Sequence, residues 1–202
     1  MNKFTFLAII GLTFVMGLAG ACSSGSDTTT NKSNQNPTNN TNAANTAKSE
    51  DDIPASIKAA FPDAQAFTKQ HKDIPKDAIA DIEKDSGAKV PDSDHHSFLA
   101  FSTAGGTRKQ IGAATIVKAG GKELVIVYDS VEGSPVIKEV RADGLSADFL
   151  KQFAGKGHDD QFTFGSAIKA NGLDETTAKT ITSAIAVDVM TMQTLYGAAH
   201  SH

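Results

Sequence analysis

Hydrophobic and polar residues alternate along the middle of the chain in four short runs, which is typical of strands with one buried face. The second and third runs are rich in Ile, Val and Thr and are joined only by Gly120-Gly121. Glycine adopts positive φ at little cost, so this pair predicts a tight hairpin. Val131–Pro135 precedes the fourth run and predicts a looser turn. We therefore expect an antiparallel meander of Ser97–Ser102, Lys109–Lys118, Glu123–Tyr128 and Val136–Arg141.

Two short helices are predicted before the meander. The first covers Ala55–Phe61, with Asp52 as its N-cap. The second is opened by Asp73 and Pro75, and Gly87 is its expected C-terminal stop.

The last third of the chain returns to a helical pattern. Ser146 is the expected cap of a short helix over Ala147–Phe153, and Asp174 is the expected cap of a long final helix. The final helix has an apolar stripe at three- and four-residue spacing that would pack on the sheet. Its members are Ala178, Ile181, Ile185, Val189, Met192 and Tyr196. The fold class expected is α+β, an antiparallel meander packed by a few helices including a long C-terminal helix.

The N-terminal 50 residues have a different character. Residues 1–21 resemble a lipoprotein signal peptide, because Lys3 precedes an apolar run that ends in Ala19-Gly20-Ala21. Cys22 follows directly and would become the lipidated residue, with a palmitate-type anchor. Residues 22–50 are rich in Ser, Thr and Asn and predict a flexible tether, so the folded domain is expected over 51–199.

Charge and cysteine content narrow the function classes. The chain has 19 basic and 23 acidic residues, a net charge of −4, which becomes −5 when Lys3 leaves with the leader. No basic patch with interleaved aromatic residues occurs, which argues against nucleic acid as a partner. The one cysteine is Cys22, so disulfides and thiolate metal sites are excluded.

Hydroxyl side chains crowd the start of the final helix around Lys179. A helix N-terminus favours a phosphate, through its free N–H groups and its dipole. Ordinary capping and surface polarity explain the same residues, and the spacing alone leaves both interpretations open. The hydroxyl residues are Thr176, Thr177, Thr180, Thr182 and Ser183.

The segment Asp174–Ser183 resembles the flavinylation motif of FMN-binding domains from Rnf and sodium-pumping quinone reductase complexes. In that family an Asp precedes a Ser/Thr-Gly-Ala-Thr core whose last Thr is esterified to the FMN phosphate by a flavin transferase. The resemblance makes Thr180 the acceptor and Asp174 the acidic residue. It assigns cofactor binding to Thr180, Thr177, Asp174, Lys179 and Ser183.

Other segments resemble the same family in the same order, over most of residues 54–196. They are Phe61–Ala64, Ile126–Asp129, Pro135–Val140 and Phe149–Lys156. Two positions depart from the family pattern. Ala178 and Lys179 replace the Gly-Ala of the core, and Asp143-Gly144-Leu145 replaces a Glu-Thr-rich turn. A lysine beside Thr180 would either hinder the transferase or offset the phosphate charge.

The resemblance implies a membrane-tethered, extracytoplasmic electron carrier with FMN bound through a threonine phosphoester. Its partners would be the membrane through the lipid anchor, a flavin transferase for maturation, and redox proteins of unknown identity. A redox carrier is expected rather than an enzyme with its own substrate. The expected place is the cell envelope, at the outer membrane facing the periplasm in a Gram-negative cell. The alternative is a flavin-free binding or assembly module of the same fold.

The remaining candidate residues give weaker indications. Phe162, Phe164 and Tyr128 are candidates for contact with the flavin ring, or else core aromatics. Ile111–Thr115 resembles the flavinylation core but lies in a strand pattern without the preceding acid. No metal site is predicted: adjacent His95 and His96 would point to opposite faces of a strand, and the histidines lack carboxylate or cysteine partners. His200 and His202 lie in the tail, and no Ser-His-Asp order typical of a hydrolase is present.

Overall fold

The computed structural model describes residues 52–198. The predicted leader, Cys22, the tether, and the tail histidines His200 and His202 lie outside the described residues. Within residues 52–198, no helix combines the length and apolar character needed to cross a membrane. The elements are α1 Ala55–Ala60, β1 Ala66–Asp73, α2 Lys76–Ser86, β2 Asp94–Ser102, β3 Lys109–Ala119, β4 Lys122–Val131, β5 Ser134–Arg141, α3 Ala147–Leu150, the 3₁₀ turn η2 Lys151–Phe153, and α4 Glu175–Tyr196.

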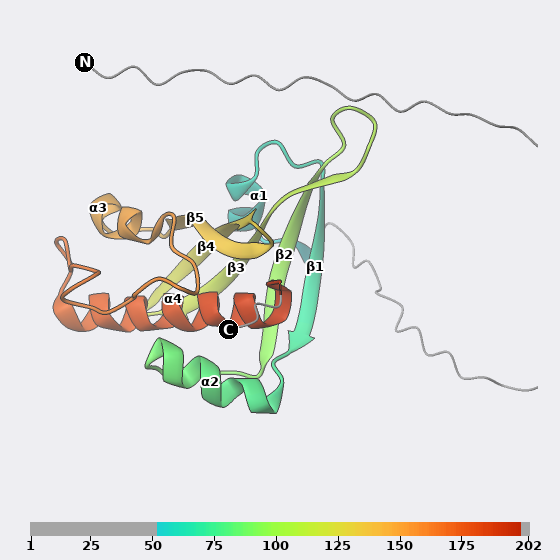
Figure 1. The fold of residues 1–202 in the computed structure, drawn as a ribbon. Helices are drawn as coiled ribbons and strands as arrows, with labels where there is room; N and C mark the ends of the chain where they lie inside the picture. The colour runs from blue at the N-terminus through green and yellow to red at the C-terminus, as the bar shows by residue number, and fades with distance from the viewer. Residues whose placement is uncertain (1–51, 199–202) are drawn as a thin grey trace, which may run out of the picture. The chain divides into compact units, whose positions relative to one another are not determined.

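The five strands form one antiparallel sheet in the order β1-β2-β3-β4-β5, with the long helix α4 lying across it (Figure 1). The predicted α+β class and the meander of the last four strands are confirmed. Strand β1 was not predicted, because its residues are mostly polar and have a weak alternating pattern. Its half-buried residues are Ala66, Phe67, Thr68 and Gln70, and its other four residues are exposed.

Both hairpins that flank β4 are two-residue turns. Gly120 and Gly121 have φ of 59° and 71°, which confirms the predicted tight hairpin. The looser turn predicted over Val131–Pro135 is wrong, because β4 runs to Val131 and β5 starts at Ser134. Glu132 and Gly133 make this turn with φ of 52° and 86°. Glutamate rarely adopts positive φ, so the sequence did not indicate a tight turn here.

The two faces of the sheet are covered by different helices. Helix α4 packs on one face, and its predicted apolar stripe is buried there from Ala178 to Met192. Phe149 and Phe153 of α3 and η2 complete this core and are fully buried. Helix α1 packs on the opposite face, where Ile57 is fully buried against a second core with Phe98 of β2.

Helix α4 is also covered on a second side. Helix α2 lies alongside it (Figure 1), and Ile82 of α2 packs with Val187 of α4 and Ile74. These three side chains are 3%, 7% and 4% exposed. A helix buried on two sides needs more apolar positions than one stripe provides. The buried surface of α4 is therefore wider than the predicted stripe and includes Val187.

The helix ends are partly as predicted. Asp174 caps α4 and Gly87 ends α2 with φ of 69°, as expected. The predicted caps Asp52 and Asp73 are wrong: the N-cap positions of α1 and α2 are Pro54 and Pro75, and Asp73 ends β1. Proline already has the φ required at a helix start, and as an N-cap residue it offers no side-chain hydrogen bond. Ser146 occupies the N-cap position of α3 as predicted, but its side chain makes no capping hydrogen bond.

Candidate functional site

The predicted cofactor segment lies at the N-terminal end of α4. Asp174 Oδ1 accepts a hydrogen bond of 2.8 Å from the backbone N–H of Thr177. This hydrogen bond, formed by the charged carboxylate, holds the pKa of Asp174 below its ordinary value. The acidic residue of the motif is therefore already engaged as the helix cap.

The hydroxyl groups of the motif point in different directions. The Thr180 hydroxyl, on the exposed side of α4, donates to the carbonyl of Thr176 at 2.9 Å. The Thr182 hydroxyl is buried and donates to the carbonyl of Ala178 at 2.7 Å. Lys179 is exposed and Ser183 is half-buried. The five hydroxyls therefore do not converge on one point, and the exposed side of the helix presents Thr180 next to Lys179.

The hairpin between β3 and β4 packs against this end of α4. A Cβ placed on Gly120 would lie 3.0 Å from Thr177 Cγ2 and 3.2 Å from Ile181 Cγ1. The hairpin also lines a shallow hollow of about 430 Å³, to which Lys118 and Lys122 contribute. The hairpin thus supports the start of α4 through Gly120, and the charged residues that line its hollow have both signs: Lys118, Lys122 and Glu123.

The candidate ring contacts lie within the packed interior or at its edge. Phe162 is half-buried and stacks on Phe153, with ring centroids 6.4 Å apart and planes 18° apart. Phe164 is half-buried against the same core. Tyr128 is 2% exposed and belongs to that core. Ile111–Thr115 lies inside β3, as its strand pattern predicted.

A buried polar cluster, which the sequence did not predict, lies under the C-terminal half of α4. Asp188 Oδ2 accepts hydrogen bonds of 2.6 Å from both the Thr115 hydroxyl and the Tyr128 hydroxyl. Asp188 Oδ1 lies 3.2 Å from His95 Nε2. Asp188 is 6% exposed. Its carboxylate is held by side chains from the three strands β2, β3 and β4. Asp188 lies on α4, whereas its partners lie on strands 60 to 93 residues away in the sequence. Residue spacing along the chain therefore does not reveal the cluster.

The two tyrosines of the cluster have perturbed acidities. Burial, together with the negative charge of Asp188, raises the pKa of Tyr128 well above its ordinary value. Burial also raises the pKa of Tyr196, against an opposing hydrogen bond from Ser97. Both phenols stay protonated in the physiological range, and the Tyr128 hydroxyl donates to the carboxylate.

Serine, histidine and aspartate meet in this cluster without forming a catalytic triad. The Ser97 hydroxyl hydrogen-bonds the Tyr196 hydroxyl at 2.9 Å, while His95 Nε2 lies against Asp188. His95 Nδ1 is buried and has no hydrogen-bond partner among residues 52–198. A triad requires the histidine to contact the serine it deprotonates, and the described side chains do not make this contact.

A hollow of about 930 Å³ opens beside the cluster, between the sheet and the C-terminal end of α4. Leu99, Tyr128 and Met192 line its apolar part. Lys72 also lines the hollow. Its Nζ donates a hydrogen bond of 2.8 Å to the carbonyl of Leu195 and lies 4.0 Å from the centre of the Tyr196 ring. A cavity of this size is in the range of small-molecule sites.

His95 and His96 point to opposite faces of β2, as predicted. His95 contacts Asp188 under α4, whereas His96 lies on the other face with His71 and Asp94. The expectation that the histidines lack carboxylate partners is wrong for these residues. Their partners come from another strand or another helix, which residue spacing does not reveal.

Comparisons with known proteins give no relative for this chain: no protein-family model, no curated protein and no solved structure matches it.

Proposed function

We propose that this protein is an FMN-carrying electron-transfer protein with the flavin phosphate esterified to Thr180. The observation that supports the proposal best is the position of Thr180. Its hydroxyl lies on the exposed side of α4, six residues after the Asp174 cap, next to the exposed Lys179. A transferase needs such an accessible hydroxyl, and a phosphoester benefits from a neighbouring cation.

The residues around Thr180 are compatible with the group. Lys179 is exposed, so its side chain does not fill packed space beside Thr180 as a buried lysine would. Thr177 is held against the Gly120 turn and Asp174 is held by its capping bond, so both keep the helix start in place. When bound, FMN supplies the one- and two-electron chemistry. The chain's own contribution would be attachment at Thr180 and charge compensation by Lys179.

The proposal extends to the setting of the domain. The leader, lipidated Cys22 and the polar tether would hold the domain at the extracytoplasmic side of a membrane, in the cell envelope. The electron donors and acceptors would then be membrane-bound or envelope proteins. These features come from residues 1–50 and stay predictions.

The test is the intact mass of the full chain made with and without a flavin transferase. We expect a gain of one FMN only with the transferase, and no gain in Thr180→Ala. The matched control is Thr176→Ala, which removes an exposed hydroxyl one turn earlier on the same helix and should keep the flavin. A Thr180→Ala chain that keeps covalent flavin, or a wild-type chain that never gains it, contradicts the proposal.

The second candidate function is a flavin-free binding module, and the 930 Å³ hollow favours it. A hollow with an apolar floor and Lys72 at its border suits a small amphipathic ligand. Native mass spectrometry of the full chain should then show a retained small molecule that Leu99→Trp displaces, because Leu99 is half-buried at the hollow and the larger ring would occupy it. Retention unaffected by Leu99→Trp, or no retained molecule, contradicts this function.

A further inference from the structure

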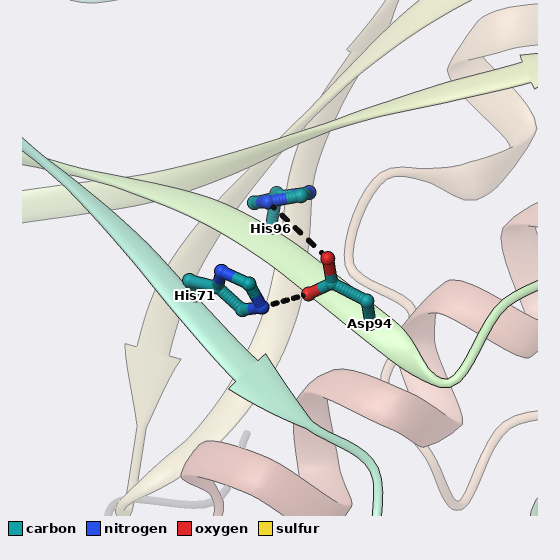
Figure 2. A group of neighbouring side chains, drawn as sticks. All are labelled: His71, Asp94 and His96. Atoms are coloured by element: carbon teal, nitrogen blue, oxygen red, sulfur yellow. Dashed lines mark ion pairs between the residues drawn. The ribbon is translucent and has the colours of Figure 1, made fainter.

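His71, Asp94 and His96 form a side-chain cluster on the face of the sheet that α4 does not cover (Figure 2). His71 of β1 is the cross-strand partner of His96 of β2, and their ring centroids are 4.8 Å apart. Asp94 precedes His96 by two residues, so it lies on the same face of β2. Two hydrogen-bonded strands therefore fix the positions of all three side chains.

The potential ligand atoms are close together and incompletely satisfied. His71 Nε2 lies 2.5 Å from Asp94 Oδ1, and His96 Nε2 lies 3.6 Å from Asp94 Oδ2. All three ligand atoms lie within 4.8 Å of one another. Asp94 Oδ1 is shielded from solvent, and its contact with His71 is an ion pair, with no hydrogen bond to this oxygen from any residue of 52–198. A shielded carboxylate oxygen without a donor is unfavourable unless a cation occupies the site.

The strand pairing adds a second reason for a cation. Asp73 is the register partner of Asp94, so two carboxylates face each other at the end of the β1–β2 ladder. Directly opposed like charges destabilise a strand pair, and a divalent cation would remove this repulsion. Lys69 is two residues before His71 on the same face and opposes Phe98 rather than the acids.

We propose that His71, Asp94 and His96 bind a divalent transition-metal ion of the zinc type. Two imidazole nitrogens and one carboxylate oxygen are a ligand set that zinc accepts, and calcium and magnesium prefer oxygen alone. Tetrahedral zinc with bonds near 2.0–2.1 Å needs ligand atoms about 3.3 Å apart. Half-exposed side chains reach that spacing by small rotations, since their exposed fractions are 60%, 32% and 43%. Three protein ligands leave a fourth position for water or for a partner's ligand.

The competing account is a pair of simple surface ion pairs between Asp94 and the two histidines. Exposed ion pairs contribute little to stability, and they do not require three ligand atoms to converge. The two accounts differ in one measurable respect, because only a metal site gives tight binding of one ion per chain that depends on all three residues.

The test is a zinc titration of the purified full chain against a chromogenic chelator. His200→Ala and His202→Ala are introduced throughout, so that the tail imidazoles do not compete. We expect one Zn²⁺ per chain, and at least about 10-fold weaker binding in His71→Ala, His96→Ala or Asp94→Ala, because loss of a ligand costs no less than loss of its outer partners. Lys69→Ala, a neighbouring exposed change on β1, should bind as tightly as the parent.

Two further measurements distinguish loss of the metal site from loss of the fold. Zn²⁺ should raise the melting temperature of the parent and leave that of the three ligand variants unchanged, while their zinc-free melting temperatures show that they fold. Co²⁺ should give visible absorption bands only in the parent and in Lys69→Ala. Equimolar Zn²⁺ that stays with the chelator, or affinity unchanged in His71→Ala and His96→Ala, overturns the proposal.

Discussion

The two ends of helix α4 lie on the same sheet but use their polar side chains differently. At the N-terminal end, Thr180 is exposed, and its hydroxyl bonds within residues 52–198 to the Thr176 carbonyl of its own helix. In the C-terminal half, Asp188 is buried and is held by groups from β2, β3 and β4. The hydrogen bonds of Asp174, Thr180 and Thr182 therefore stay within the start of the helix, whereas those of Asp188 fix the helix on the sheet.

This difference indicates which side chains can be modified without lowering the stability of the fold. A side chain whose only hydrogen bond is within its own helix can be modified with little effect on packing. A buried acid with three partners cannot be changed without leaving those partners unsatisfied. Substitutions in the two halves of α4 measure this contrast, and those in the C-terminal half have the larger expected effects on stability.

Asp188→Ala should have the largest effect on stability. The change leaves the Thr115 and Tyr128 hydroxyls and His95 without their shared acceptor, and buried unsatisfied groups cost about 1–3 kcal/mol each. We expect the free energy of unfolding to fall by about 3 kcal/mol or more in urea titration. The control is Asp148→Ala, whose side chain is 81% exposed and which should change stability by about 0.5 kcal/mol or less. Equal effects in the two variants would remove the contrast.

Tyr128→Phe should have the second-largest effect. It removes one donor to Asp188 while Thr115 and His95 stay, so a loss of about 1–2 kcal/mol is expected. The raised pKa of Tyr128 means that the folded state holds this proton more tightly than the unfolded state. Its stabilising contribution is full below the ordinary tyrosine pKa, about 10, and is lost as the pH rises above it.

The alkaline loss should become smaller in Tyr128→Phe, measured as the free energy of unfolding between about pH 8 and pH 11. Tyr196, the second of two tyrosines in the chain, also has a raised pKa and should account for part of the remaining loss. Tyr196→Phe is therefore the matched comparison. An alkaline dependence identical in wild type and Tyr128→Phe contradicts the prediction.

The same contrast explains which features the sequence could predict. The cap at Asp174, the stop at Gly87 and the Gly120-Gly121 hairpin depend on residues close in sequence, and all three are confirmed. The apolar stripe of α4 was predictable because one helix face repeats every three to four residues.

Features that depend on strand pairing could not be predicted. Asp188 meets His95 across 93 residues, and His71 meets His96 only because β1 pairs with β2 in one register. Strand β1 itself is mostly polar, so its pairing with β2 is what identifies it as a strand. An inward-facing acid in an apolar stretch, such as Asp188 between Val187 and Val189, is the one local indication of the buried cluster.

Asp174→Asn should have a smaller effect that appears only at low pH. Asparagine caps helices as well as aspartate does, so stability near neutral pH should change little. The lowered pKa of Asp174 gives a contribution that is present above the ordinary carboxyl pKa, about 3.9, and is lost as the pH falls through its lower folded pKa. The variant should therefore lose less stability than the wild type between about pH 5 and pH 2, measured by urea unfolding. A steeper acid loss in the variant would contradict this assignment.

Thr180→Ala should have the smallest effect on stability of these changes. The Thr180 hydroxyl bonds only to the Thr176 carbonyl, and alanine is the better helix former, so the free energy of unfolding should stay within about 0.5 kcal/mol of the wild type. The measurement is urea unfolding of the flavin-free chain. If Thr180→Ala instead lost more than about 1 kcal/mol, the residue would have a structural role, and a missing flavin in that variant would no longer identify the attachment site. Unchanged stability together with a lost flavin would show that the exposed Thr180 side of α4 can be modified without loss of packing, in contrast to the buried side that Asp188 holds.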